Sequence, residues 1–233
     1  MREIRTREAR LLWVLTALSG LLGATALTQT VGYFVTFMTG NARVAVVGLF
    51  KSHYWLSASG AMLMASFLGG VVLASLCRRH LWVGHPHSPT ALTTLFLIIA
   101  TAIDAVDGVD GVTFVSIVFV AFALGAMNTS FVRDGEVTTP VSYVTGTLVK
   151  FGQGIERHIS GGSASDWLGY ILQFTSYTAG ATIGGCISLV ANGSQMLAAA
   201  TAASAAITVY TFRTNRVEIP NQRQTDAVEA QAL

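Results

Sequence analysis

Long uncharged apolar runs constrain this chain more than any other feature of its sequence. Most of these runs approach the ~20 residues that cross hydrocarbon as a helix, and the third does so only by including Asp104 near its end. Charged residues make up 11% of the chain, against about 25% in soluble domains. Strands of a membrane barrel would instead alternate over ~10 residues. The sequence therefore predicts an all-α membrane protein with six transmembrane helices. The six runs are Leu11–Phe34, Leu56–Cys77, Ser88–Ile103, Gly111–Val132, Trp167–Val190 and Ser194–Phe212.

The basic residues orient these six predicted spans. Only Arg43 and Lys51 fall on one side of the membrane, and the positive-inside rule makes the other side cytoplasmic. We expect residues 1–10 to form a cytoplasmic tail, residues 11–212 the membrane domain and residues 213–233 a disordered cytoplasmic tail. The net charge of +2 then reflects topology and favours no nucleic-acid partner. The residues on the cytoplasmic side are Arg2, Arg5, Arg7, Arg10, Arg78, Arg79, Arg133, Lys150, Arg157, Arg213, Arg216 and Arg223.

The chain contains an internal repeat. FVTFMTGN (34–41) pairs with PVSYVTGT (140–147) at an offset of 106 residues, and GLLGA (20–24) pairs with GAMNT (125–129) at an offset of 105. Further on, SFLGGVV (66–72) corresponds to TAGATIGG (178–185). Residues 11–106 and 111–212 then form two repeats of three spans each. An odd number of spans inverts the second copy, as in many secondary transporters, and we expect a short helix after each Thr-Gly pair.

The Thr-Gly segments are the main candidates for a solute path. A helix N-terminus there would attract an anion or polar solute, and Arg43 would strengthen its field. Two alternatives stay open: each segment is only a turn capped by Thr39 or Asn41, or the duplication gave a pseudo-symmetric bundle without a path. The candidate path residues are Thr39, Gly40, Asn41, Arg43, Asn128, Thr145, Gly146 and Thr147.

Other polar residues point to no catalytic centre. The spans show no nucleophile with a base, so we expect no enzyme activity, no cofactor and no metal site; His80, His85 and His87 are interpreted as loop residues. Asp104 is the exception, because an ionisable residue within the hydrocarbon boundary is a functional candidate. Cys77 and Cys186 are expected to be buried small hydrophobic residues without a disulfide.

Small residues indicate where helices touch. Gly180-x-x-x-Gly184 and Ser66-x-x-x-Gly70 permit close approach of two backbones. Contacts within one chain are the favoured interpretation, and a homo-oligomer joined through such faces is the alternative.

These motifs resemble the YoaK-like family of bacterial inner-membrane proteins, a family defined by a domain of unknown function. The resemblance rests on FVTFMTGN, GAMNTSFVR (125–133), YVTGTL (143–148) and the glycine-rich second and fifth spans, and covers about residues 10–212. It implies a polytopic protein of the bacterial inner membrane without an established activity. Where such relatives carry an acidic residue in the first span, this chain has Gly23, whose repeat partner is Asn128. Any proton or sodium coupling through that carboxylate would be absent here.

Together these features predict a transporter or channel-like protein for a small polar or anionic solute, with the lipid bilayer as its other partner. The alternative is a non-transporting scaffold or regulatory subunit that docks a partner on its alanine-rich sixth span.

Overall fold

The chain folds into helices. The computed structural model describes residues 7–30, 32–81, 88–107, 111–133 and 136–215. Within them the only strands form a two-residue hairpin, β1 (Val132–Arg133) with β2 (Glu136–Val137). The eight α-helices of these residues are α1 (Arg7–Gln29), α2 (Met38–Phe50), α3 (Tyr54–Leu76), α4 (Ser88–Asp107), α5 (Phe114–Asn128), α6 (Val144–Ile159), α7 (Ser165–Ile187) and α8 (Gly193–Asn215), and a π-helical turn, η1 (Cys77–Leu81), extends α3.

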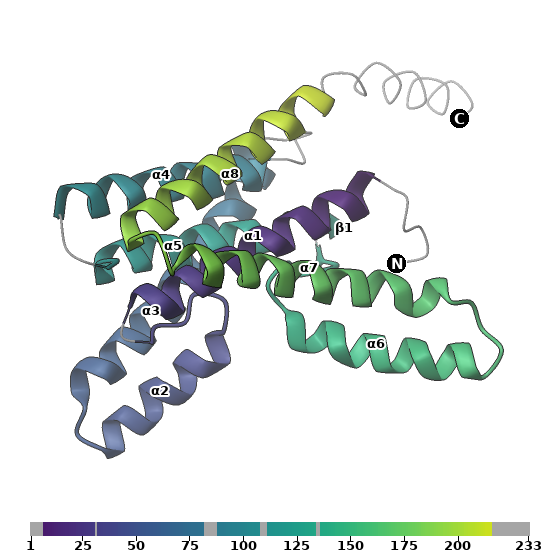
Figure 1. Ribbon diagram of the computed structural model, residues 1–233, viewed down its shortest axis with the longest axis horizontal. Coiled ribbons are helices and arrows are strands. Elements are labelled where there is room, and N and C mark those ends of the chain that lie inside the picture. Colours follow the sequence, from purple (N-terminus) through teal and green to yellow (C-terminus); the bar gives the residue numbers. More distant parts are fainter. Residues whose placement is uncertain (1–6, 31, 82–87, 108–110, 134–135, 216–233) are drawn as a thin grey trace.

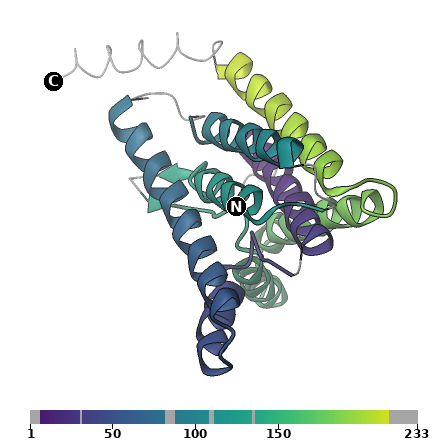
Figure 2. The same ribbon diagram turned by 90° about the vertical axis from the view of Figure 1, so that its left-hand side faces the viewer.

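The helices pack in pairs that are distant in sequence. α1 lies along α7 and α3 lies along α5, while α2 and α6 fold back on α3 and α7 as two hairpins. Figure 1 shows these hairpins projecting from the bundle in different directions. Figure 2 shows α2 against only one end of the long α3. α4 packs on α5, α8 packs on α1, and α4 and α8 pack on each other.

All six predicted spans form helices, with boundaries that differ from the apolar runs. The first run was expected to continue to Phe34, but α1 ends at Gln29, and Gly32 adopts a φ of +90° that ends regular helix. The helices also extend into the predicted tails, because α1 begins at Arg7 and α8 continues to Asn215. Residues 1–6 and 216–233 of those tails lie outside the described residues.

Glycines allow the two close helix crossings. Across the α1–α7 contact, a Cβ added at Gly20 would lie within 3.0 Å of the Tyr177 carbonyl oxygen. A Cβ added at Gly180 would likewise lie within 3.0 Å of the Ala17 carbonyl oxygen. The same holds across the α3–α5 contact, where Gly125 faces the Phe67 carbonyl and Gly70 faces that of Phe122. The predicted role of Gly70 and Gly180 as contact residues within the chain is therefore confirmed.

The helix directions alternate. α1 and α7 are parallel, as are α3 and α5, whereas α4 runs antiparallel to both α5 and α8. The Gln29 carbonyl accepts a hydrogen bond of 3.0 Å from Val112 N–H, which joins the end of α1 to the start of α5. One end of the bundle, here called the basic end, therefore carries Arg7, Arg10, Arg78, Arg79 and Arg213.

A hydroxyl seam joins α4 to α8. Thr94 Oγ1 lies 2.7 Å from Ser204 Oγ and 2.8 Å from Thr208 Oγ1, and Thr101 Oγ1 lies 2.7 Å from Thr201 Oγ1. Thr208 also donates to the Thr90 carbonyl at 3.0 Å. Hydroxyl pairs of this kind join helices in surroundings that offer no water.

Four helical segments have the length and composition to cross a membrane: Arg7–Gln29, Tyr54–Leu81, Ser88–Asp107 and Gly193–Arg213. α5 is apolar but has 15 residues, and α7, with 23 residues, does not meet both conditions. Four of the six predicted spans are thus supported on both counts.

Candidate functional site

The two Thr-Gly segments have the same local structure. Along residues 35–41 and 141–147, buried, half-buried and exposed positions follow in the same order. Neither segment is a capped turn, because α2 begins at Met38 after Phe37 and α6 at Val144 after Tyr143, in both cases without a side-chain cap. The alternative of a turn capped by Thr39 or Asn41 is therefore wrong, and both Thr-Gly pairs lie inside the first helical turn.

An aromatic ring lies over each glycine. A Cβ at Gly40 would collide with the ring of Phe37, and one at Gly146 would collide with the ring of Tyr143. Only glycine lets the ring before the helix fold back onto its first turn. Thr39 and Thr145 are exposed beside these buried glycines.

The residue after each glycine is polar and buried. Asn41 is 2% exposed and donates from Nδ2 to the Phe34 carbonyl at 2.6 Å. Thr147 is 5% exposed and donates from Oγ1 to the Tyr143 carbonyl at 3.1 Å. Both side chains thus donate to a backbone carbonyl of the segment that precedes their helix. These bonds fix the direction of the chain where each helix begins.

Asn128 holds the segment that precedes the second Thr-Gly pair. Its Nδ2 donates to Ser142 Oγ at 2.9 Å and to the Leu124 carbonyl at 2.8 Å, and its Oδ1 accepts from Ser142 N–H at 3.0 Å. At the corresponding place before the first pair, Thr36 Oγ1 lies 3.2 Å from the hydroxyl of Tyr177, and both lie next to Gly23. Asn128 therefore contacts the residues that lead into the second Thr-Gly pair. The two Thr-Gly pairs themselves lie on separate hairpins (Figure 1).

Asp104 joins three helices. It is 1% exposed near the end of α4, and its Oδ1 accepts from Thr113 N–H, just before α5, at 3.0 Å. Its Oδ2 accepts from the hydroxyl of Ser194 in the first turn of α8. Both carboxylate oxygens therefore accept hydrogen bonds that join α4 to the starts of α5 and α8, as in a structural role.

Sequence reasoning missed Gln173 on α7. It is 2% exposed, and neither its Nε2 nor its Oε1 has a hydrogen-bond partner among the described residues. An unpaired buried amide is unfavourable by about 1–3 kcal/mol, so native structures rarely keep one without a role. Its place in the run ILQFTS (171–176) looks like an ordinary polar interruption, and only the burial distinguishes it.

The remaining candidates do not assemble into a reactive centre. The described residues contain no group of three or more His, Cys, Asp or Glu side chains that could hold a metal ion. His85 and His87 lie outside the described residues. Cys77 is buried as expected, but Cys186 is exposed, so that prediction is wrong for the second cysteine.

An all-helical chain with several apolar helices of spanning length and polar groups buried between them defines a helical membrane protein. More particularly, the chain belongs to the family described as "protein of unknown function (DUF1275)", which it matches over residues 11–210. No curated protein and no solved structure matches it.

Proposed function

We propose that this chain is an inverted-repeat transporter that moves a small polar solute across the bacterial inner membrane. The observation that carries the proposal is an exchange of helix contacts between the two halves: α1 of the first packs on α7 of the second, and α5 of the second packs on α3 of the first. In the predicted repeat α1 corresponds to α5 and α3 corresponds to α7, so the two contacts are equivalent.

The glycine crossings support this equivalence residue by residue. Gly20 faces the Tyr177 carbonyl and Gly125 faces the Phe67 carbonyl. Gly20 and Gly125 are 105 residues apart, the offset of the repeat in that region, and Phe67 and Tyr177 are 110 apart, as are Gly70 and Gly180. The helix contacts therefore give an offset of 110 where the segments SFLGGVV and TAGATIGG begin 112 residues apart. A two-fold axis that exchanges the halves accounts for both contacts.

The hydroxyl seam follows the same relation. Thr94 contacts Thr208, and Thr101 contacts Thr201. Thr94 and Thr201 are 107 residues apart, as are Thr101 and Thr208, so exchanging the halves converts one contact into the other. The seam is then the place where a group of α1, α6, α7 and α8 meets a group of α2, α3, α4 and α5.

In such an arrangement, transport is a rocking of one group against the other. The buried polar groups that we assign to the path are Asn41, Asn128, Thr147 and Gln173. All four are uncharged hydrogen-bonding side chains, which favours a neutral polar solute. The unpaired amide of Gln173 gains partners when the path opens and the solute binds.

We also propose the orientation. Because lysine and arginine are retained on the cytoplasmic side, the basic end faces the cytoplasm and both chain termini lie there. Asn41 is then approached from outside and Thr147 from the cytoplasm.

Flux measurements test the assignment of Gln173. In liposomes, the wild type is expected to move at least one solute of a neutral polar panel faster than empty vesicles do. Gln173→Leu is expected to abolish this flux while raising the Tm, because an apolar side chain of similar size removes the unpaired amide. Gln153→Leu, on the exposed surface of α6, is the control that leaves both unchanged. A flux in Gln173→Leu equal to that of the wild type would remove this residue from the path.

Cysteine labelling tests two-sided access. In a background with Cys77 and Cys186 replaced by serine, Asn41→Cys is expected to react with a small water-soluble thiol reagent added outside, and Thr147→Cys with reagent added to the cytoplasmic side. Since both positions are buried here, reaction requires a second conformation and is expected to be slow. Gly152→Cys, at an exposed position with open space around it, is the fast-reacting control.

The alternative function is a non-transporting scaffold or regulatory subunit, which the exposed alanine positions of α8, such as Ala198 and Ala199, favour. It predicts no flux for any solute, inert cysteines at residues 41 and 147 beside a reactive control, and a partner that co-purifies with the chain.

A further inference from the structure

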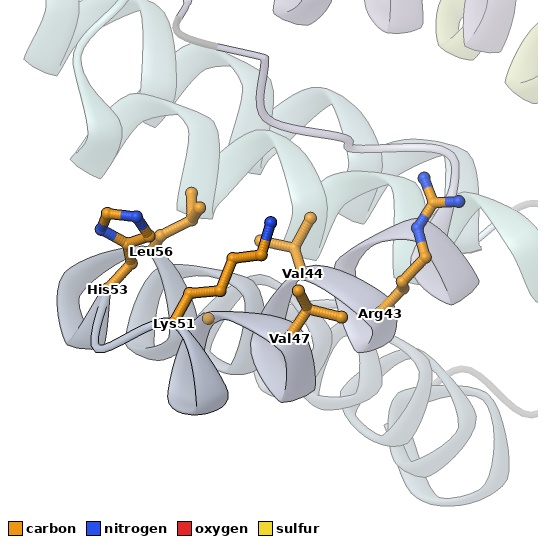
Figure 3. A pocket seen from close by; sticks show the side chains of 7 residues that line it. Arg43, Val44, Val47, Lys51, His53 and Leu56 are labelled. Atoms are coloured by element: carbon orange, nitrogen blue, oxygen red, sulfur yellow. The ribbon is translucent and has the colours of Figure 1, made fainter.

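A hollow lies between α2 and α3 at the end of the bundle opposite the basic end. It has a volume of about 360 Å³ and is open to the surroundings. Three cationic or titratable side chains line it, Arg43, Lys51 and His53, together with the apolar side chains of Val44, Val47 and Leu56. Figure 3 shows Arg43 at one end, His53 at the other, and the Lys51 chain extending between them toward Val44.

Among the described residues, no acid neutralises this hollow. α2 and α3 contain no Asp or Glu, and the side chains of Arg43 and Lys51 form no ion pair within the described part of the chain. Arg43 lies on α2 and Lys51 directly follows its last residue, eight residues further on, which separates their Cα atoms by about 12 Å. Long flexible side chains of this reach can converge on one anionic group.

The position of these bases is exceptional for the molecule. Lysine and arginine are depleted on the non-cytoplasmic side of membrane proteins, and the other basic residues of the spanning helices gather at the basic end. Two exposed bases in one hollow at the opposite end, with no acid beside them among the described residues, favour an anionic ligand.

The neighbouring surface indicates where the ligand comes from. Phe50 is 86% exposed, Tyr54 67% and Trp55 65%, and aromatic side chains of this kind mark the headgroup level of a bilayer. A ligand with a charged head and apolar chains matches both the bases and the valine and leucine walls.

From these observations we propose that the hollow between α2 and α3 binds the phosphate headgroup of an anionic phospholipid in the non-cytoplasmic leaflet. Arg43 and Lys51 contact the phosphate, His53 borders it, and the acyl chains continue along Val47 and Leu56. This binding does not depend on the proposed transport, whereas the choice of leaflet rests on the proposed orientation.

Native mass spectrometry of the full-length protein tests the proposal. With phosphatidylglycerol added to the detergent-solubilised protein, a bound lipid is expected, and phosphatidylcholine is expected to bind much more weakly. The double variant Arg43→Gln/Lys51→Gln is expected to bind phosphatidylglycerol about thirtyfold more weakly. Val47→Glu, which adds an anion while keeping both bases, is expected to weaken binding as well.

The control variant is Arg10→Gln/Arg79→Gln, which removes two exposed bases from the other end and is expected to bind as the wild type does. Equal binding of phosphatidylglycerol by all variants, or equal binding of both lipids by the wild type, would overturn the proposal. Inorganic phosphate is the second probe: competition with the lipid supports recognition through phosphate. Binding of inorganic phosphate without any lipid binding would overturn the lipid as the source.

Discussion

Replacing Gly180 by alanine is expected to lower the Tm of the purified protein by roughly 6–12 °C. The new Cβ would lie within 3.0 Å of the carbonyl oxygen, carbonyl carbon and Cα of Ala17. All three are backbone atoms, so α1 as a whole has to move away from α7. Overpacking of this kind destabilises by about 1–3 kcal/mol, at the upper end here, and each kcal/mol lowers the Tm of a chain of this size by roughly 2–4 °C.

Gly185→Ala is the matched control on the same helix. A Cβ at Gly185 has nothing within 4 Å, and alanine favours the helix over glycine by about 1 kcal/mol, so its Tm is expected to stay level or rise. Gly125→Ala, whose Cβ would meet the backbone of Phe67, is expected to lose as much stability as Gly180→Ala. A small effect at residue 125 beside a large one at residue 180 would argue against equivalent crossings.

The second large effect is expected at Asp104. Asp104→Ala removes the acceptors of Thr113 N–H and of the Ser194 hydroxyl, and buried donors left without partners destabilise by about 1–3 kcal/mol each. We expect a loss of about 3 kcal/mol in the free energy of unfolding, measured by denaturant titration in detergent.

Asp104→Asn separates a structural role from a functional one. Asparagine keeps an acceptor for Thr113 and a group that can bind Ser194, so it is expected to recover more than half of the stability lost in Asp104→Ala. If the proposed flux proceeds at the wild-type rate in Asp104→Asn, the carboxylate only joins helices. A stable variant without flux would instead identify Asp104 as an ionisable group of the transport cycle.

The helices could be predicted because apolar runs of this length leave few alternatives in a membrane. The boundaries were less predictable: α1 ends five residues before its apolar run does, because Gly32 adopts a backbone conformation that its sequence context does not reveal. The cap expected at Asn41 is wrong for a related reason. The Asn41 side chain donates to the carbonyl of Phe34, which precedes the helix. An asparagine in the sequence is equally compatible with this bond and with a helix cap, so the sequence does not distinguish them.

The candidate site also has features that the sequence predicts and features that it does not. The pairing of the Thr-Gly segments and the contact roles of Gly70 and Gly180 follow from repeated small residues. Gln173 could not be found, since an amide in an apolar run becomes unusual only when its burial and lack of partners are known. The partner of Asp104, Ser194, is 90 residues away along the chain, and no local pattern connects the two.

The exchange of helix partners between the halves has a consequence for biosynthesis. α1 leaves the ribosome before α7, and α7, against which its glycine face packs, follows more than 130 residues later. Until α7 arrives, the face around Gly20 lies against lipid or insertion machinery, and the face around Gly70 does so until α5 arrives. Each half contains one helix hairpin, α2 with α3 or α6 with α7, but the glycine crossings form only between the halves. The membrane-inserted first half is therefore an intermediate that only the arrival of the second half completes.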